Sequence, residues 1–574
     1  MLLKRKKNSS HQSTPNQMYN PPEFRCTLKV SSINFSFKSI GEQRMIIESF
    51  GKFLNSINCS VQILCENNII DPNKWLLKNH DEEYYDFLKK TIEEKKVTIA
   101  LFYVVFSASN EYELNLTKTN IIKQIKRCGL ISEEVELFDP QFKPKLSKNH
   151  VKVGEWYYST LIVDDWPHSG EAGWMEDLYN LDKNISLSMF IHPAEKENAT
   201  YFINRRLAQL KSSDMVKAED DADDGSEDAE INTAINMRDE LYRNDGKFFF
   251  VNYYITVKAK SLDELQFESK NIRNFLNGLM ISTRKADFRQ DDGFRCSLPH
   301  GVDYLKSKSL YTFTTTPLKS FFPFISSNIV DDGGILIGEN LSNNSLVFLN
   351  HFNYFTASML VIGKSGSGKS YGVKSQISKL VKQGIEVTVL DIDREFKNMQ
   401  LDDNLIVKSF NEMSEFKEFL IKYWEEVRNN PHIPRFLVID EFWEYMKDEE
   451  CSYIIQQIIK KGRKHWLGLC AITQEVEDLL ESEFARSIIN NSSIKMLLKM
   501  EFSQKEQLQK TFGITESESS FLINADEGEG ILFAGTNHVQ FKTIVSESQH
   551  KMITTKPQEI WSDFIIKNER KVNV

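Results

Sequence analysis

The sequence lacks several features that would place it in large protein classes. Its seven cysteines are scattered and form no CxxC pair, which disfavours both a zinc site and a disulfide framework. The best candidate for a membrane span, 97–106, is far shorter than the roughly 20 residues that a spanning helix needs, and it fits a buried strand better. The basic start of the chain, 1–7, is followed by no apolar segment, so the sequence predicts no signal peptide.

Three catalytic motifs and an excess of positive charge are also missing. The sequence holds no GxSxG, no HExxH and no GxGxxG after a strand, so hydrolases, zinc proteases and dehydrogenases of those types find no support. The formal net charge is -10. This balance disfavours a protein that coats DNA, but it is compatible with a local basic patch or a pore lined by few cations.

Three regions follow one another along the 574 residues. Residues 1–22 are polar and predict a disordered tail. Residues 23–325 mix strand-like and amphipathic helical runs, which predicts an α+β N-terminal domain, interrupted by an acidic, solvated loop at 219–230. Residues 326–574 alternate apolar strands with helical runs, which predicts an α/β domain with a parallel sheet.

A glycine-rich loop lies in the third region, between the apolar strand 358–362 and the helical run 371–382. Glycines let backbone N–H groups approach phosphate oxygens, and the start of a helix adds the positive end of its dipole. This order predicts an ATP site in which Lys369 reaches the β- and γ-phosphates and Ser370 binds Mg²⁺. The loop residues expected to hold the nucleotide are Gly363, Lys364, Ser365, Gly366, Ser367, Gly368, Lys369 and Ser370.

Two adjacent carboxylates directly follow the apolar run 436–439. We expect Asp440 to hold Mg²⁺ through its water shell and Glu441 to polarise the attacking water. A solvated strand end would look the same locally, but the position downstream of a phosphate loop suits a nucleotide site. The acidic run 391–395 ends another apolar strand, where support of Mg²⁺ or nucleotide and a purely structural role are both open.

A third apolar strand, 466–472, leads to a polar amide. We expect Gln474 to sense the γ-phosphate or to orient water. The basic stretch 460–465 precedes this strand, and its Arg463 is predicted to enter a neighbouring subunit's site as an arginine finger. A solvated basic loop is the alternative for Arg463, and Arg486 is the second candidate finger.

Together these motifs resemble a known group of motors. The segments are VIGKSGSGKS, LDIDREF, FLVIDEFW, KKGRKHWLGLCAITQ and EGEGILFAG. They resemble the VirB/TrbE/TraC-type ATPases of conjugation and type IV secretion, within the wider HerA/FtsK group of ring-forming P-loop motors. Upstream segments around Trp166, Trp174, 188–193 and 316–324 look like that family's N-terminal domain, so the resemblance covers about residues 150–560.

The resemblance implies a RecA-like P-loop ATPase domain and hydrolysis of ATP with Mg²⁺. It implies a cytoplasmic homo-oligomer, a hexamer or a dimer, that works with other channel subunits and energises channel assembly or substrate transfer. Peripheral attachment to the inner face of the membrane and contact with DNA stay open, as does the alternative of a HerA/FtsK-like DNA-translocating ATPase. Only 398–435 separate the second strand from the Asp440 strand, so the long helical insertion of many relatives is shortened or absent.

Overall fold

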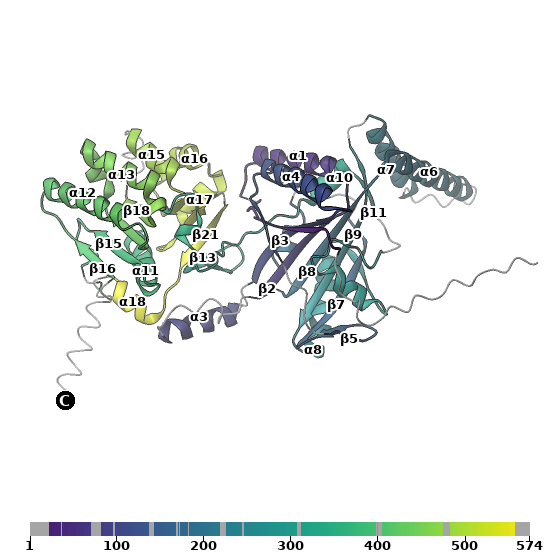
Figure 1. Ribbon diagram of the computed structural model, residues 1–574, viewed down its shortest axis with the longest axis horizontal. Coiled ribbons are helices and arrows are strands. Elements are labelled where there is room, and N and C mark those ends of the chain that lie inside the picture. The colour runs from purple at the N-terminus through teal and green to yellow at the C-terminus, as the bar shows by residue number, and fades with distance from the viewer. Residues whose placement is uncertain are drawn as a thin grey trace, which may run out of the picture. The chain divides into compact units, whose positions relative to one another are not determined.

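The computed structural model divides into two compact units (Figure 1). The first unit comprises 1–32, 40–68 and 100–325, and the second comprises 33–39, 69–99 and 326–574. The described residues are 22–556 and 559, without 36, 70–81, 96–97, 137–142, 168–169, 171–172, 182, 219–225, 244–245, 307–310, 398, 400–403, 475–482 and 536. The predicted tail, 1–22, thus lies outside them except for its last residue. No helix among the described residues is long and apolar enough to cross a membrane.

An antiparallel sheet forms the centre of the first unit. Its order is β4-β1-β3-β2-β8-β9-β7-β6-β5, with β10 paired to β7 and β11 to β9. The strongly buried strand β9 pairs with β8, β7 and β11. The strands are β1 (Arg25–Val30), β2 (Val61–Ile69), β3 (Thr98–Ser107), β4 (Ser132–Glu134), β5 (Lys145–Leu146), β6 (Val151–Val153), β7 (Trp156–Asp165), β8 (Ile185–Ala194), β9 (Phe248–Ala259), β10 (Ser282–Lys285) and β11 (Tyr311–Thr314).

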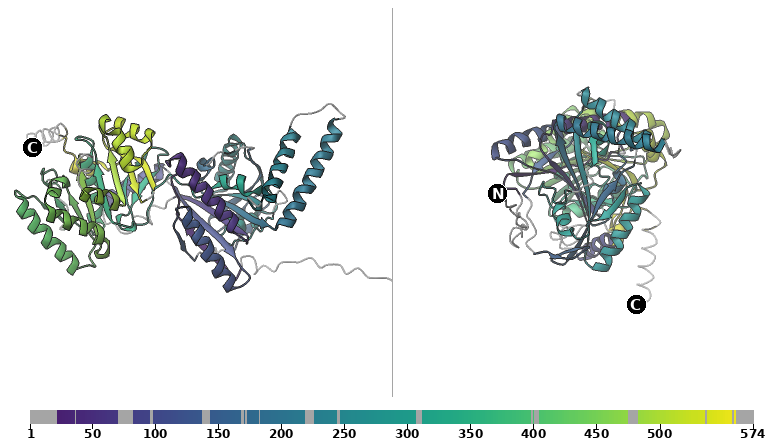
Figure 2. Two further views of the ribbon diagram at one scale, coloured as in Figure 1. Left: turned by 90° about the horizontal axis from the view of Figure 1, so that it is seen from above. Right: turned by 90° about the vertical axis from the view of Figure 1, so that its right-hand side faces the viewer.

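Helices complete the first unit, which agrees with the predicted α+β class. They are α1 (Ile40–Ser56), α4 (Glu111–Arg127), α5 (Glu176–Tyr179), α6 (Lys196–Ala218), α7 (Ser226–Tyr242), α8 (Leu262–Gly278), α9 (Gln290–Cys296), α10 (Thr315–Leu318) and η1 (Lys319–Phe321). Figure 2 shows α6 and α7 as a neighbouring pair.

The predicted acidic loop at 219–230 is wrong in its second half. Residues 219–225 lie outside the described part, but α7 begins at Ser226 and includes 226–230. Acidic side chains near a helix N-terminus interact favourably with the helix dipole, so charge repulsion did not exclude a helix here. Further along, α7 packs on α6 through Ala234 and Leu241.

The predicted N-terminal domain, 23–325, does not hold as one unit. Helix α3 (Glu82–Lys95) packs in the second unit, where its Tyr84, Leu88 and Ile92 join a buried cluster with Leu336 and Phe348. The segment 33–39 also belongs there. Its Asn34 donates a side-chain hydrogen bond of 2.9 Å to the carbonyl of His538.

The sheet of the second unit has the order β13-β12-β21-β20-β19-β14-β18-β17-β15-β16. The pairs from β16 to β19 are parallel, which confirms the prediction for six strands, whereas the pairs from β19 to β13 are antiparallel. The strands are β12 (Ile335–Asn340), β13 (Leu346–Leu349), β14 (Ser358–Ile362), β15 (Glu386–Leu390), β16 (Leu405–Lys408), β17 (Arg435–Ile439), β18 (Leu467–Thr473), β19 (Ile494–Leu498), β20 (Glu529–Ala534) and β21 (Asn537–Thr543).

Helices cover both faces of this sheet. On one face, a buried hydrophobic cluster packs the sheet against α12, α13, α15, α16 and α17. On the other face, a second cluster packs it against α11 and α18. Between β15 and β17 the described part contains only β16 and α12, in agreement with a short insertion. The helices are η2 (His351–Asn353), α11 (Lys369–Lys382), α12 (Met413–Asn429), η3 (Phe442–Lys447), α13 (Glu449–Lys461), η4 (Gly462–His465), α15 (Glu483–Asn491), η5 (Phe502–Gln504), α16 (Lys505–Phe512), α17 (Glu516–Asn524) and α18 (Glu547–Ile553).

Candidate nucleotide site

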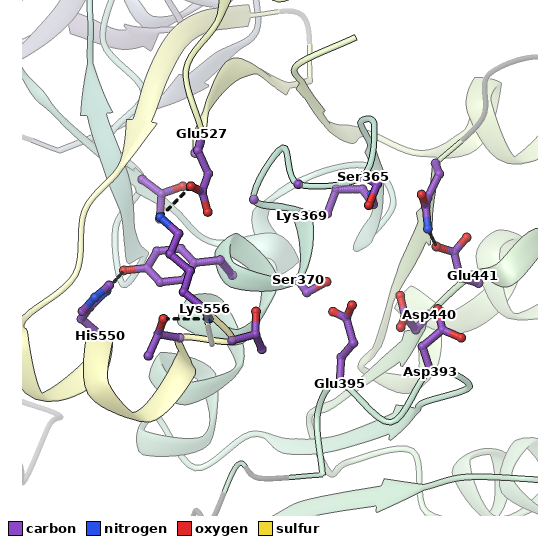
Figure 3. A pocket seen from close by; sticks show the side chains of 18 residues that line it. Ser365, Lys369, Ser370, Asp393, Glu395, Asp440, Glu441, Glu527, His550 and Lys556 are labelled. Carbon is purple, nitrogen blue, oxygen red and sulfur yellow. Dashed lines mark hydrogen bonds and ion pairs between the residues drawn. The ribbon is translucent and has the colours of Figure 1, made fainter. Parts of the chain in front are cut away.

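Four parallel strands bring the predicted motifs to one edge of the sheet. The phosphate loop follows β14, 391–395 follows β15, Asp440 follows β17 and Gln474 follows β18. Because the carboxyl ends of parallel strands meet at the same edge, these groups surround a cavity of about 300 Å³ (Figure 3). Its lining comprises Ser365, Gly366, Gly368, Lys369, Ser370, Tyr371, Asp393, Glu395, Asp440, Glu441, Gln474, Glu527, Gly528, Thr543, His550, Thr554, Thr555 and Lys556.

The glycines of the loop are required by its backbone. Gly366 and Gly368 have φ values of 73° and 93°, which side chains rarely adopt. A Cβ at Gly368 would also lie 2.9 Å from the backbone nitrogen of Gly528. That nitrogen donates a hydrogen bond of 3.0 Å to the Ser367 carbonyl, so the residue before β20 supports the loop.

Three of the eight predicted loop residues do not line the cavity. Lys364 pairs with Glu501 at 2.9 Å, and Gly363 and Ser367 lie beneath the loop surface. Ser367 is fully buried, and its hydroxyl has no hydrogen-bond partner within the described part of the chain. Gly363 and Ser367 therefore support the loop from below, whereas the partly exposed Lys364 forms its ion pair outside the cavity.

Lys369 lies at the start of α11 and is 7% exposed. Its ammonium group donates to the Lys364 carbonyl at 3.2 Å. Burial lowers its pKa from the ordinary value, while Glu441, Asp440 and Glu395 favour its charged form. An anion entering the cavity would favour the charged form further.

Several acidic side chains line the part of the cavity around Asp440. Burial raises the pKa of Asp440 to about 7, and the neighbouring charges of Glu441, Glu395, Asp391 and Asp393 add to this effect. The sequence left open whether 391–395 supports Mg²⁺ or nucleotide or has a structural role, and different residues of the segment suit these two roles. Asp391 accepts the backbone N–H groups of Glu395 and Phe396 at 3.0 and 2.9 Å and so shapes the turn, whereas Asp393 and Glu395 line the cavity.

Glu441 is held from two directions. The Gln474 amide donates to one carboxylate oxygen at 2.5 Å, and the Trp443 indole donates to the other at 3.2 Å. Glu441 also has a φ of 42°, a left-handed conformation that is unusual outside glycine. Glu441 and Gln474, which were predicted separately as site residues, are thus in direct contact, and neither this contact nor the one to Trp443 was apparent from the sequence.

Neither candidate arginine lines the cavity. Arg463 lies in η4, at the amino end of β18, and donates to the Phe355 carbonyl at 3.1 Å. Because β18 spans seven residues, Arg463 is about 20 Å from the edge that carries the cavity. Arg486 lies exposed in α15. The structure therefore excludes Arg463 from the cavity of its own chain.

Sequence reasoning missed the side of the cavity that the end of the chain builds. Glu527 and Gly528 precede β20, Thr543 ends β21, and His550 lies in α18. The EGEG run was a signal for the first two, whereas nothing in the local pattern marks His550 or Lys556. These residues lie far along the chain from the phosphate loop, so only the folded sheet brings them together.

Comparison with known proteins gives a family match in the second unit. Residues 417–560 match the family model of the TraG P-loop domain, a range that includes Asp440, Glu441 and Gln474 but begins after the phosphate loop. No curated protein matches the sequence significantly.

Solved structures similar to the chain include VirB4 of Thermoanaerobacter pseudethanolicus, at 16% identity and a TM-score of 0.36 over 39% of this chain and 100% of that one. B204, the DNA-packaging ATPase from Sulfolobus Turreted Icosahedral Virus, is 18% identical with a TM-score of 0.28, over 33% and 98%. The pCW3 conjugation coupling protein TcpA is 16% identical with a TM-score of 0.29, over 38% and 70%. Similarity at this level assigns neither substrate nor partner. The family match agrees with the predicted resemblance within its range: residues 417–560 are similar to the TraG P-loop domain.

Proposed function

We propose that the chain is an ATP-hydrolysing motor of a conjugative transfer or type IV secretion apparatus. One observation carries the proposal: Lys369, Asp440 and the bonded pair Glu441 and Gln474 surround one cavity in a unit that matches the TraG P-loop domain. A lysine, carboxylates and a residue that orients water around a phosphate loop are the recurring parts of enzymes that transfer a phosphoryl group to water.

The phosphate loop is assigned to the triphosphate. Backbone N–H groups of the lining residues Ser365, Gly366 and Gly368 and of the first turn of α11 supply donors for phosphate oxygens. The Lys369 ammonium now donates to the Lys364 carbonyl, and a phosphate oxygen would replace that acceptor. The exchange is favourable because an anionic phosphate stabilises the charged lysine that burial disfavours.

The oxygens of Ser370 and Asp440 fit a divalent cation, although the described residues contain no group of three or more carboxylate, histidine or cysteine side chains arranged to hold one. Repulsion among Asp393, Glu395, Asp440 and Glu441 contributes to the raised pKa of Asp440, and a cation would offset it. Oxygen ligands are those that Mg²⁺ prefers, and we assign Ser370 and Asp440 to hold it. When bound, the ion neutralises charge on the phosphates during transfer.

Glu441 is assigned to the attacking water. Its carboxylate is oriented by Gln474 and Trp443 before any nucleotide enters. A water bonded to an oriented carboxylate gives up its proton as it attacks phosphorus. Gln474 contacts the same carboxylate from the end of β18, which suits a residue that senses the γ-phosphate.

An arginine finger would come from a second copy of the chain. Arg463 lies at the wrong edge of the sheet for its own cavity, so its proposed role requires a homo-oligomer, a hexamer or a dimer. Arg486 stays the second candidate.

The proposal also includes a cytoplasmic location, attachment at the inner face of the membrane, and other channel subunits as partners.

The test combines the purified protein with transfer in cells. Glu441→Gln should bind ATP without turnover and reduce transfer to background, whereas Glu444→Gln, a neighbouring carboxylate that does not line the cavity, should behave like the wild type. Lys369→Ala should lose ATP binding. Undiminished transfer by an inactive ATPase would contradict the proposal. Strong stimulation of hydrolysis by duplex DNA, without channel subunits co-purifying, would favour a DNA-translocating motor instead.

A further inference from the structure

The cavity has a second side that the proposed hydrolysis does not use. It consists of Tyr371 from the first turn of α11 together with Glu527, His550, Thr554, Thr555 and Lys556 from the end of the chain. We call these six residues the C-terminal rim. Figure 3 shows Glu527, His550 and Lys556 on one side of the phosphate loop, and Asp393, Asp440 and Glu441 on the other.

We infer that the C-terminal rim is the binding site for the nucleoside, and that the ring faces of Tyr371 and His550 contact the base. The inference rests on the proposed function, because it takes the phosphate loop as the site of the triphosphate. Hydrolysis places the γ-phosphate beside Glu441 and Lys369. The other end of the triphosphate, which carries the nucleoside, then points away from Glu441 and toward the rim.

Two rings of the rim lie against each other at the loop. The Tyr371 hydroxyl and the His550 Nδ1 are 2.8 Å apart, and the ring centroids are 5.7 Å apart with an interplanar angle of 63°. Both side chains are partly exposed at the cavity. A base has two π-faces, and stacking on an aromatic side chain is tolerant of base identity. The rings therefore offer a surface to a base next to the phosphates.

The polar side chains of the rim other than Thr555 are already bonded to one another or to Glu559. His550 Nε2 lies 3.2 Å from the Glu559 carboxylate, which also accepts the Thr554 hydroxyl at 2.5 Å. Lys556 pairs with Glu527 at 2.7 Å. Within the described residues, the rim thus offers a base its ring faces and the Thr555 hydroxyl more than other free donors and acceptors. We conclude that the site binds purine nucleotides with little discrimination between adenine and guanine.

The ion pair of Lys556 and Glu527 closes the rim at the solvent side. Both side chains are about half exposed, at 50% and 48%. Exposed ion pairs contribute little to stability, so a bound nucleotide can displace one partner at small cost. The rim can therefore accept a ribose without a rearrangement of buried structure.

The test compares ligands with and without a nucleoside on the full-length protein. ATP, GTP and inorganic tripolyphosphate are titrated by calorimetry in the presence of Mg²⁺. Tyr371→Ala should weaken ATP binding about tenfold, as expected for loss of one stacked base, and leave tripolyphosphate binding unchanged. Tyr371→Phe retains the ring, so its ATP affinity should stay within about twofold of the wild type.

Each outcome bears on the inference. An unchanged ATP affinity in Tyr371→Ala, or an equal loss of ATP and tripolyphosphate, would overturn it, because neither result assigns the ring to the nucleoside. A preference for ATP over GTP greater than about twentyfold would overturn the weak discrimination between bases. Lys369→Ala separates the two proposals. If Lys369→Ala leaves tripolyphosphate binding intact, the assignment of the phosphate loop to the triphosphate is wrong. The proposed function then fails independently of the result for Tyr371→Ala.

Discussion

At the scale of single residues, hydrogen bonds from neighbouring residues orient the groups that line the cavity. Glu441 carries the proposed chemistry, but Gln474 and Trp443 fix where its oxygens point. Asp391 plays the same part for 391–395, since it accepts two backbone N–H groups of the turn that presents Asp393 and Glu395. Residues of this kind influence catalysis through geometry rather than through contact with the nucleotide.

The indole of Trp443 provides a direct test of this orientation. Trp443→Phe keeps an aromatic ring but removes the donor to Glu441, so we expect the turnover number to fall about tenfold with little change in ATP affinity. Steady-state hydrolysis and equilibrium binding measure the two effects. Trp466→Phe, at an exposed tryptophan outside the cavity, is the matched control. A turnover number equal to the wild type would remove Trp443 from the positioning of Glu441.

A buried histidine gives the second unit a dependence on pH. His351 is fully buried and shares a contact of 3.1 Å with Gln376, and burial lowers its pKa to about 4. The unfolded chain takes up a proton near pH 6.5, before the folded chain does, so this stabilising term is complete above about pH 6.5 and is lost as pH falls toward 4.

We therefore expect this histidine to reduce the free energy of unfolding by about 2 kcal/mol between pH 7 and pH 5. Urea denaturation at both pH values measures the change. His351→Gln removes the imidazole, so its stability should depend less on pH by the same amount. Parallel pH profiles of the two proteins would show that His351 does not titrate as described.

At the scale of elements, the β20–β21 hairpin contributes to the candidate nucleotide site. Gly528 precedes β20 and bonds to the phosphate loop, and Thr543, which ends β21, donates its N–H to the Gly528 carbonyl at 2.9 Å. The parallel strands could be predicted from their apolar runs and the polar residues that follow them. The hairpin could not, because its place beside β19 depends on pairing between distant segments.

Two glycines at this junction make a matched pair. A Cβ at Gly368 would lie 2.9 Å from the Gly528 nitrogen, whereas one at Gly528 would meet only the Thr543 Cβ, at 3.9 Å. Both have positive φ, so each alanine carries a conformational cost of about 1 kcal/mol. We expect Gly368→Ala to abolish ATP binding and Gly528→Ala to preserve it with a small loss of thermal stability. Equal affinities in the two variants would contradict the proposed packing.

At the scale of the whole molecule, neither arginine candidate lines the cavity of its own chain, so an arginine finger would have to come from a second copy. The sequence predicted that Arg463, in the basic stretch just before a strand, enters a neighbouring subunit's site. In the structure that strand separates Arg463 from the cavity of its own chain, since Arg463 lies at its start and Gln474 follows its end. Strand direction is a property of the fold, and the motif alone did not reveal the separation.

Mixing two inactive chains tests whether Arg463 acts between copies. Arg463→Ala lacks the finger and Lys369→Ala lacks the phosphate contact, so each alone should be inactive. In a mixed oligomer, an intact phosphate loop meets an intact arginine at some interfaces, and ATP hydrolysis should recover in part. The control mixes Lys369→Ala with a chain that carries both Arg463→Ala and Glu441→Gln. Every site in that mixture lacks either Lys369 or Glu441, so no activity should return. Failure of rescue at every mixing ratio would count against Arg463 and direct attention to Arg486.

The division of the chain limits how the units can be separated. The polypeptide passes between the two units after residues 32, 39, 68, 99 and 325, so neither unit is one continuous stretch of chain. The passages after 32 and 39 bracket 33–39, whose Asn34 bonds to the His538 carbonyl in the hairpin of the second unit. A fragment that begins after residue 39 would lack this segment and its contact to the hairpin, so truncation at a single point cannot isolate the unit that carries the phosphate loop.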